Sequence, residues 1–441
     1  MASREHAAPH PAPHPAPHPA CRPGAAPSLG AVPRRADRPL LEGWCQAQAR
    51  GFHQARLQES SRAVWLDHLR GDGVRPLGIW EEQPALGAGA LPVATYSSYD
   101  KQLHTGARQV TARMISDITV APTHRRQGLL RSLITADLRE AAETGVPVAA
   151  LTASEGSIYG RFGFGPATVE QQWEVDTSLR FALRGAAPSG RVVLLEPAEA
   201  WPAVAAVFAR WHERQRGSLQ RPRFYESMLT GAWHPAQDGP DHRLRVAVHL
   251  DAAGEPDGHV AYRVEGDRGV RTADVVDLVT LGPTAHRALW RFLADLDLVG
   301  SVRWNHASTA DPLPWSLVEP RAVRVVGQRD SLWVRLVDVP AALAARPWYA
   351  EGSVVLEVAD PLGLASGRWR LTASAGRATC EPSTDPAQVR LEADTLGSLY
   401  LGGTRVETLS AAGRVAGDPA AVHAFATMST GGPVPHSLTD F

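Results

Sequence analysis

The chain has 441 residues, of which 44% are hydrophobic and 21% charged, and its formal net charge at pH 7 is -1. This length and composition predict a folded protein of about two to four domains. The near-neutral charge argues against nucleic acid or an anionic membrane as the main partner. No run of about 18 apolar residues predicts a membrane span, and the N-terminus lacks the apolar segment of a secretory signal.

The chain contains only three cysteines, which are scattered along its length. They are too few for a disulfide framework or a metal cluster, so we expect a reducing compartment and place the protein in the cytoplasm. Residues 1–37 contain the Pro-rich repeat APHPAPHPAPHPA, which cannot bury a core and predicts a disordered tail. His10, His14 and His18 could chelate a metal, but an extended chain does not hold them on one face, so we predict no metal site.

Globular composition begins at about residue 38, and the expected elements follow in a regular order. They are helices at 44–52 and 62–69, strands at 77–82, 91–103 and 109–120, a helix from Gln127 or Gly128, and a buried strand at 146–154. The helix from Gln127 carries one apolar stripe formed by Leu129, Leu130, Leu133, Ile134, Leu138 and Ala141. The order strand, tight turn, helix, strand therefore surrounds the sequence TVAPTHRRQGLLRSL.

This strand–turn–helix pattern recurs later in the chain. Residues 118–133 can be aligned with residues 279–294 so that Pro122 falls on Pro283, followed by a helix of similar register. In this alignment Gly128 falls on Leu289. If the glycine allows a ligand to approach the backbone, the second copy should not bind that ligand. Chance similarity over so few residues is the alternative.

The last hundred residues change character, and a further domain is expected from about residue 326. The predicted strands are 353–361, 367–376, 377–382 and 388–394, and the predicted helices are 395–403 and 421–429. Helices packed on one side of a small sheet are typical of an α+β domain.

The turn after Pro122 places Arg125 and Arg126 at a helix N-terminus, where the helix dipole favours acidic groups instead. Backbone N–H groups at such a turn, with Gly128 to admit another molecule, form a cradle for phosphate. The two arginines would add charge-assisted donors to the same anion. A solvated arginine pair is the alternative, and neither the Walker pattern nor the dinucleotide fingerprint is present.

These residues carry a resemblance to a known family. VAPTHRRQGLLR resembles the coenzyme A pyrophosphate loop of GNAT acetyltransferases, and ALTASEGSIYGRFGFGPAT is similar to the Eis-like branch of aminoglycoside N-acetyltransferases. Looser similarity continues to the C-terminal residue. The resemblance implies a mixed α+β chain with a GNAT domain at 38–178, a degenerate GNAT-like domain at 185–325 and a sterol-carrier-protein-like domain at 326–441. It also implies a homohexamer.

The resemblance implies acetyl-CoA as the acetyl donor. Backbone groups of residues 118–120 would pair with its pantetheine arm, and residues 126–131 would hold its pyrophosphate. The cofactor-binding residues predicted in this way are Ile118, Thr119, Val120, Arg125, Arg126, Gln127, Gly128, Leu129, Leu130, Arg131, Ser154 and Glu155. Leu130 departs from the small residue that is usual in the wider superfamily.

Acetyl transfer to an amine needs a base for the amine and an acid for the leaving thiolate. Tyr159 is the predicted general acid, because a phenol with a pKa near 10 stays protonated at neutral pH. Its alternative role is to pack with Phe162 and Phe164 in the core. We expect Gly156 and Gly160 to give Tyr159 an unusual backbone path. The resemblance implies that the C-terminal carboxylate of Phe441 is the general base.

The acceptor implied by the resemblance is an aminoglycoside, a polycation that needs carboxylates and aromatic faces in its pocket. Phe52, Trp65 and Asp440 are the predicted substrate-binding residues. A core position is the alternative for Trp65. Two other functions stay open: acetylation of protein lysines, and a non-catalytic lipid-binding or scaffold protein.

Overall fold

The computed structural model describes residues 34–35, 38–178, 180–234, 239–266 and 271–441. All of the predicted N-terminal tail except Arg34 and Arg35 lies outside these residues, including its three histidines. Among the described helices, none combines the length and the apolar character that crossing a bilayer requires.

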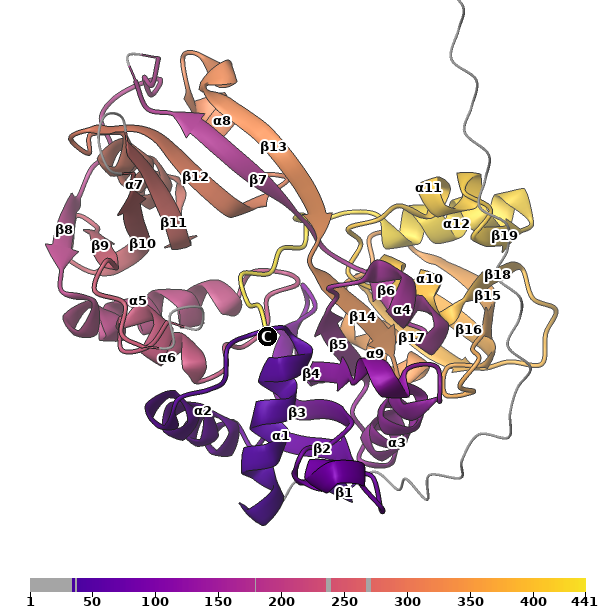
Figure 1. Ribbon diagram of the computed structural model, residues 1–441. Helices are drawn as coiled ribbons and strands as arrows, with labels where there is room; N and C mark the ends of the chain where they lie inside the picture. The colour runs from indigo at the N-terminus through magenta and orange to yellow at the C-terminus, as the bar shows by residue number, and fades with distance from the viewer. Residues whose placement is uncertain (1–33, 36–37, 179, 235–238, 267–270) are drawn as a thin grey trace, which may run out of the picture.

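The first domain is built on a seven-stranded sheet in the order β1-β2-β3-β4-β5-β14-β6 (Figure 1). Its elements are β1 (Arg34–Arg35), α1 (Arg38–Gly51), α2 (Glu59–Gly71), β2 (Arg75–Ile79), β3 (Ala94–His104), β4 (Gln109–Val120), α3 (Leu129–Glu143), β5 (Val148–Thr152), α4 (Gly156–Tyr159) and β6 (Gly165–Pro166). The predicted strands and helices of this region are confirmed, and β4 has the predicted limits. Both helices before the sheet are longer than predicted.

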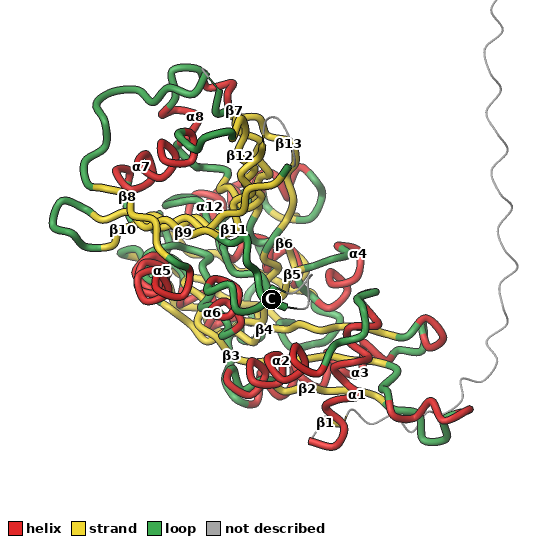
Figure 2. The backbone as a smooth tube through the Cα atoms, turned by 60° about the vertical axis from the view of Figure 1, so that its left-hand side comes forward, coloured by secondary structure: helices red, strands yellow, loops and turns green. Residues whose placement is uncertain are grey.

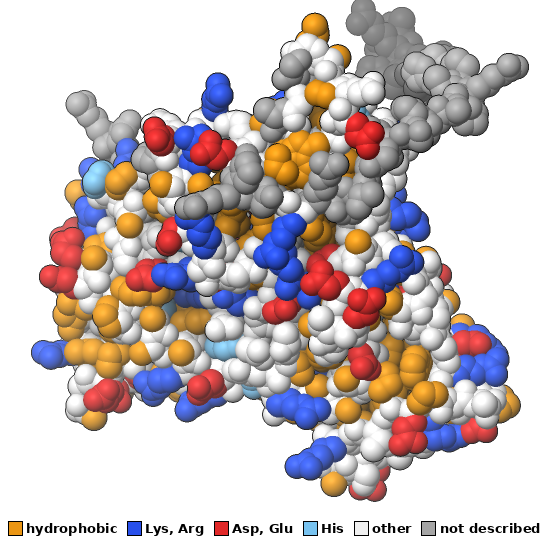
Figure 3. Space-filling model, turned by 90° about the horizontal axis from the view of Figure 1, so that it is seen from below, with side chains coloured by type: hydrophobic (Ala, Val, Ile, Leu, Met, Phe, Trp, Pro, Cys, Tyr) orange, Lys and Arg blue, Asp and Glu red, His pale blue; other side chains and the backbone are white. Residues whose placement is uncertain are grey.

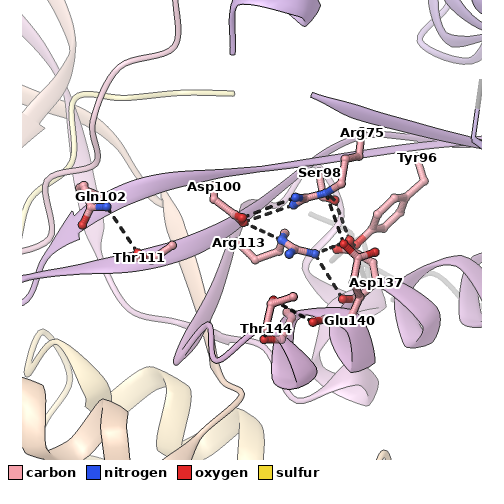
Figure 4. A network of polar contacts seen from close by, with 11 residues as sticks. Arg75, Tyr96, Ser98, Asp100, Gln102, Thr111, Arg113, Asp137, Glu140 and Thr144 are labelled. Carbon is pink, nitrogen blue, oxygen red and sulfur yellow. Dashed lines mark hydrogen bonds and ion pairs between the residues drawn. The ribbon is translucent and has the colours of Figure 1, made fainter. Parts of the chain in front are cut away.

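A buried polar network holds helix α3 against the sheet (Figure 4). The apolar stripe of α3 packs on the same sheet. Asp137 lies on the buried side of α3 and accepts hydrogen bonds from Tyr96 at 2.8 Å, Ser98 at 2.6 Å and Arg113 at 2.6 Å. Burial opposes the charge of Arg113, but Asp137 and Asp100 outweigh it and raise the pKa of Arg113. Because removal of one partner would leave an uncompensated buried charge, the network fixes the position of α3 on strands β3 and β4.

The second domain has a seven-stranded sheet in the order β13-β7-β12-β11-β10-β9-β8. Its elements are β7 (Val169–Asp176), β8 (Arg191–Leu195), α5 (Pro197–His212), α6 (Phe224–Leu229), β9 (Arg245–Leu250), β10 (Pro256–Glu265), β11 (Arg271–Thr280), α7 (Pro283–Ala294), β12 (Val299–Ser308), α8 (Leu313–Ser316) and β13 (Val323–Asp330). Its core contains Trp173, Trp290 and Trp304, all less than 3% exposed. Burial of such large side chains contributes most of the hydrophobic stabilisation of the domain.

The internal repeat is present in three dimensions. In the first domain β4 pairs in parallel with β5 over 112–114 and 148–150, and in the second β11 pairs in parallel with β12 from 271–275 and 299–304. In both domains a helix follows the first strand of the pair. The predicted helix register is wrong, however, because α3 begins at Leu129 whereas α7 begins at Pro283 itself. The second copy therefore lacks the whole loop of the first, and not only its glycine.

The two sheets exchange strands, so the predicted boundaries at residues 178 and 326 do not coincide with the sheets. Strand β7 follows the first domain in sequence but pairs with β12 and β13 in the second sheet. Strand β14 (Leu332–Leu336) follows β13 and returns to the first sheet, where it lies between β5 and β6. All five residues of β14 are buried, which is typical of a strand covered on both faces. Figure 1 shows β7 and β13 as a long pair of strands that joins the domains.

The C-terminal domain has a five-stranded sheet in the order β17-β16-β15-β18-β19. Its elements are α9 (Val339–Ala345), β15 (Gly352–Ala359), β16 (Gly367–Ser374), β17 (Arg377–Pro382), β18 (Val389–Glu392), α10 (Ala393–Tyr400), α11 (Val406–Ala411), β19 (Val415–Gly417) and α12 (Pro419–Ser429). The predicted strands and helices are present, whereas α9, α11 and β19 were not predicted. Its apolar core is continuous with that of the first sheet.

After α12 the chain returns to the centre of the molecule. Figures 1 and 2 place the C-terminus between the first sheet and the helices of the second domain. On the face seen from below, basic and acidic side chains are interspersed, without a continuous field of one sign (Figure 3). The described side chains drawn on that face form no extended basic patch of the kind that binds nucleic acid.

Candidate active site

A cavity of about 290 Å³ opens in the first domain where β4 and β5 stop pairing. We call it the first cavity. Parallel pairing ends at Met114 and Ala150, and the two strands then diverge. The lining residues are Phe52, 115–118, 151–154, Tyr159, Glu170, 329–331, Asp440 and Phe441. The divergence leaves the β5-facing side of β4 without a strand partner beyond residue 114, so backbone groups of residues 118–120 are available to a ligand that adds to the sheet edge.

A bulge in β4 turns Asp117 toward this cavity. The register between β3 and β4 shifts at Thr95 and Ser97, and Asp117 has a φ of 53° in the left-handed region. Its carboxylate accepts hydrogen bonds from Ser97 at 2.6 Å and from Gln48 at 2.9 Å. Burial outweighs these bonds and raises the pKa of Asp117. Bulges of this kind are frequent beside active sites, where they redirect a side chain.

The predicted phosphate cradle is an exposed loop that leads into α3. A short 3₁₀ turn at Pro122–His124 begins it, and His124 is held by Glu81 at 2.9 Å. Arg126 and Gly128 then have φ values of 64° and 77°, both in the left-handed region. No side chain caps the N-terminus of α3 and no acidic residue lies in its first turn. The free N–H groups and the helix dipole therefore suit an anion, as the residues of the loop predict.

Tyr159 lies at the end of α4 and borders the first cavity. Its ring belongs to the same buried cluster as Phe162 and Phe164, so the residue is both a core aromatic and a cavity residue. Burial, with a smaller contribution from the charge of Glu155, raises the pKa of Tyr159. The hydroxyl therefore stays protonated at neutral pH, which is the state that a general acid needs.

The backbone around Tyr159 differs from the prediction. Gly160 has an ordinary helical φ of -55°, and Gly156 has no left-handed φ either. The left-handed residue is Gly163, with a φ of 79°. A Cβ atom there would lie 1.9 Å from Nη1 of Arg335, so this glycine is required by both conformation and close packing.

The C-terminal residue is inserted into the first cavity. Thr152 donates a hydrogen bond of 2.9 Å to the terminal oxygen of Phe441, and the Phe441 ring lies edge-on to Tyr99 at 6.4 Å. Upstream, Asp440 N–H donates to the Tyr225 hydroxyl at 2.8 Å and the Thr439 hydroxyl donates to the Leu219 carbonyl at 2.8 Å. The terminus is thus held by contacts with two domains, unlike the frayed end that is usual.

The second domain contributes a charged group to the rim of the first cavity. Glu170 is 1% exposed and contacts Nδ1 of His306 at 3.1 Å as well as Arg329. Oδ2 of Asp440 lies 3.9 Å from the same His306 nitrogen. Burial disfavours the charge of His306, but the hydrogen bond with Glu170 and the charge of Asp440 outweigh it and raise its pKa.

The structure places only part of the predicted site residues at the first cavity. Ile118, Ser154, Tyr159, Asp440 and Phe441 all border the first cavity. The other predicted cofactor residues continue from it along β4, the loop and the start of α3, and Glu155 precedes α4.

The structure places the two aromatic residues that were predicted to bind the acceptor, Phe52 and Trp65, in different surroundings. Phe52 borders the first cavity and is 44% exposed. Trp65 instead packs against Trp44, with ring centroids 6.0 Å apart, and is not among the cavity residues. The substrate role of Trp65 stays a prediction without support from this cavity, because the apolar side of helix α2 packs toward α1.

Sequence reasoning missed several residues of this cavity. Asp117 interrupts an otherwise apolar strand pattern, and this was the available signal for it. Thr152 lies inside the motif that carried the resemblance. Glu170 and His306 are 136 positions apart and had no local signal, because strand exchange alone brings them together.

Comparison with known families agrees with this architecture. Two acetyltransferase (GNAT) domain families match residues 33–167 and 217–336, and a sterol carrier protein domain family matches residues 339–436. The predicted fold class, tandem GNAT domains followed by a sterol-carrier-protein-like domain, is confirmed. The GNAT fold implies acetyl-CoA as co-substrate.

Individual relatives define the branch more closely. An uncharacterized N-acetyltransferase of Streptomyces griseus is 36% identical over 381 residues, which are 84% of this chain and 90% of the relative. The N-acetyltransferase Eis of Mycobacterium tuberculosis is 40% identical over 312 residues, 68% of this chain and 73% of its own. The crystal structure of Eis1 from Mycobacterium abscessus matches with a TM-score of 0.77 and 30% identity over 93% of this chain and 100% of that chain. The chain is thus an N-acetyltransferase and belongs to the Eis-like branch of the GNAT superfamily.

Proposed function

We propose that this protein transfers the acetyl group of acetyl-CoA to amines of a polycationic acceptor, with aminoglycosides as the leading substrate class. One observation carries the proposal: Tyr159 and the C-terminal residue Phe441 border the same cavity, at the divergence of β4 and β5. The two groups that acid–base chemistry needs therefore converge from the first domain and from the C-terminus.

The terminal carboxylate of Phe441 is the proposed general base. An α-carboxyl group is a weak base, with a pKa near 3.5 in water, so it must be held at the attacking amine or act through a water. The hydrogen bond from Thr152 directs one of its oxygens, and the Phe441 ring anchors it against Tyr99. Tyr159, the proposed general acid, gives its proton to the departing thiolate. This removes the charge that would otherwise build up on the sulfur.

The acetyl donor would lie along β4 and the loop before α3. The unpaired edge of residues 118–120 suits the amide groups of a pantetheine arm. Arg125 and Arg126 are exposed beside the uncapped start of α3, and the structure shows no ion pair for either among the described residues. They are available to a pyrophosphate.

The acceptor is expected to be cationic because the first cavity is rich in carboxylates. Four acidic side chains and the terminal carboxylate line it, against one arginine. A neighbouring cavity of about 270 Å³ shares Asp440 and is bordered by Asp274 and Asp277 as well. Burial raises the pKa of Asp274, so a cationic ligand would favour its ionised form. Several amines of one acceptor could be bound across the two cavities.

Release of coenzyme A thiol from acetyl-CoA tests the proposal, with kanamycin, tobramycin, a lysine-rich peptide and buffer offered in parallel. Native-terminus protein should turn over the aminoglycosides, and Tyr159→Phe should lower kcat by about 10²-fold or more, since general acid catalysis contributes about 10²–10⁴-fold. A short extension after Phe441 should lower kcat similarly, because it removes the carboxylate from its position beside Thr152.

The controls for this assay follow from the structure. Phe162→Leu alters the same aromatic cluster without touching the first cavity, and it should retain most activity. Turnover of the peptide alone would move the proposed function to protein lysines. Unchanged turnover in both Tyr159→Phe and the extended chain would contradict the acid and base assignments.

We also propose that the protein assembles as a homohexamer in the cytoplasm. The edge strand β13 exposes Val325 and Val326, each at 55%, and nearby Trp315 is 84% exposed. An apolar sheet edge is a typical contact surface. The two described cysteines, Cys45 and Cys380, are free and buried, as expected in a reducing compartment. Light scattering coupled to size exclusion measures the assembly, and Val325→Lys should reduce the mass.

A further inference from the structure

The second domain has a cavity of about 530 Å³ at the position that corresponds to the first cavity. It lies where β11 and β12 diverge after their parallel pairing, and it is lined by Leu278 and Thr280 of β11 and by Trp304 and Ser308 of β12. The start of α7 closes one end, through Gly282 and Pro283. We call it the second cleft. Duplication of the fold has thus duplicated the cleft.

The second cleft cannot cradle a pyrophosphate in the way that the first loop can. Helix α7 begins at Pro283, directly after β11, so residues that would form the loop lie in the helix instead. His286 N–H, for example, donates to the carbonyl of Gly282 at 3.1 Å. The start of α7 nevertheless has no side-chain cap and no acidic residue in its first turn. Room remains there for a single small anionic group.

The ring of His286 belongs to the wall of the second cleft. His286 borders the cleft and is 5% exposed, and its Nδ1 has no hydrogen-bond partner among the described residues. Trp290 Nε1, which can only donate, lies 3.2 Å from His286 Nε2, and Asp311 lies 3.1 Å from the same nitrogen. Nδ1 carries the proton in the neutral tautomer whose Nε2 accepts from Trp290, whereas it is an acceptor in the neutral tautomer whose Nε2 donates to Asp311.

The remaining lining combines one free cation with an apolar floor. Arg214 is exposed at the rim, and among the described residues the structure gives its side chain no ion pair. Leu278 and Trp304 form a buried floor, with exposures of 6% and 2%, and Leu281 adds to the apolar wall. A carboxylate on an apolar body fits both parts, because it pairs with Arg214 and buries its body on the floor.

The second cleft also adjoins the segment that ends in the proposed base. Val434, His436 and Leu438 border the second cleft, whereas Asp440 and Phe441 border the first cavity. His306 borders the second cleft and contacts Glu170, which borders the first cavity, at 3.1 Å. An occupant would therefore touch the C-terminal segment without entering the acetyl-transfer site.

We propose that the second cleft binds a small carboxylate with an apolar body, held by Arg214 and the start of α7. Octanoate is the probe. Isothermal titration of the full-length protein, without acetyl-CoA or acceptor, should show octanoate binding and at least about tenfold weaker binding of octylamine, which has the same chain and the opposite charge. Because no acetyl transfer is involved, the result does not depend on the proposed function.

Variants of residues that line the second cleft test whether octanoate binds there. Arg214→Gln should weaken octanoate by about tenfold, Arg214→Lys should restore part of it, and Leu281→Trp should abolish it by filling the cleft. Arg243→Gln is the matched control, because Arg243 is an exposed arginine of the same domain outside the lining. Thermal unfolding confirms that each variant is folded. No octanoate binding at millimolar concentration, equal binding of octylamine, or full affinity in Leu281→Trp would overturn the proposal.

Discussion

His306 brings a titratable side chain of the second domain to the rim of the first cavity. Its ring faces two carboxylates, Glu170 at 3.1 Å and Asp440 at 3.9 Å. Arg329 also pairs with Glu170, and its positive charge acts against the charged form of His306. Burial works against the charge of Glu170, but hydrogen bonds from His306 and Arg329 lower its pKa. The raised pKa of His306 and the lowered pKa of Glu170 describe one ion pair within the second sheet, and Asp440 of the C-terminal segment lies beside it.

This pair predicts a pH dependence of stability. The folded pKa of His306 is raised, so its contribution is complete below the unfolded value of about 6.5 and is lost as pH rises through the folded value. His306→Gln should therefore lower Tm more at about pH 6 than at about pH 9. Differential scanning fluorimetry at both pH values measures the difference in Tm between the variant and the unchanged protein.

The control for this prediction is His423→Gln, which changes an exposed histidine on α12. Its effect on Tm should be small and similar at the two pH values. A His306→Gln effect that grows with pH would contradict the assignment of the charged form to His306.

At the scale of elements, backbone conformation rather than side-chain packing explains why glycine occupies position 128 in the loop before α3. Gly128 has a φ of 77°, and a Cβ atom there would meet nothing within 4 Å. A side chain would thus cost strain, about 1–2 kcal/mol for a left-handed residue, without a steric clash. The same is true of Gly145 after the other end of α3, which has a φ of 74° and equally open surroundings.

These two glycines form a matched pair of tests. Gly128→Ala and Gly145→Ala should each lower the free energy of unfolding by about 1–2 kcal/mol. Only Gly128→Ala should also weaken acetyl-CoA, because it disturbs the N–H groups that are proposed to hold the pyrophosphate. Chemical denaturation and calorimetric titration measure the two effects. Equal acetyl-CoA affinity in both variants would contradict a role of the loop in binding.

At the scale of the whole molecule, the three domains are not separable units. β14 lies between β5 and β6 although it follows β13 of the second domain in sequence. Its Arg335 is fully buried and pairs with Asp360, which comes after β15. The first sheet is therefore completed only when the chain beyond residue 331 has folded against it.

This interdependence predicts that the first domain does not fold alone. A fragment of residues 38–178 should show no cooperative thermal transition and little near-ultraviolet circular dichroism, because a central strand and a shared core are missing. The matched control is residues 34–441, which retain every described element and should unfold like the full chain. A cooperative transition in the short fragment would show that β14 is dispensable.

Much of the fold follows from local patterns in the sequence. Alternation of apolar residues located most strands, and the apolar stripe of α3 located that helix, because such patterns depend only on neighbouring positions. The resemblance of residues 120–131 and 150–168 led to the family, which the relatives confirm. The roles of Tyr159 and Phe441 remain predictions that their shared cavity supports.

What the sequence determined by itself was therefore local: the elements, the loop conformation that needs Gly128, and the family signature. The tertiary structure decided the strand exchange, the bulge at Asp117, the meeting of Glu170 with His306, and the place of Trp65 away from the cavity. These features depend on pairing between segments more than a hundred residues apart or on the packing of whole elements. No local periodicity encodes such contacts, because they form only when the sheets assemble.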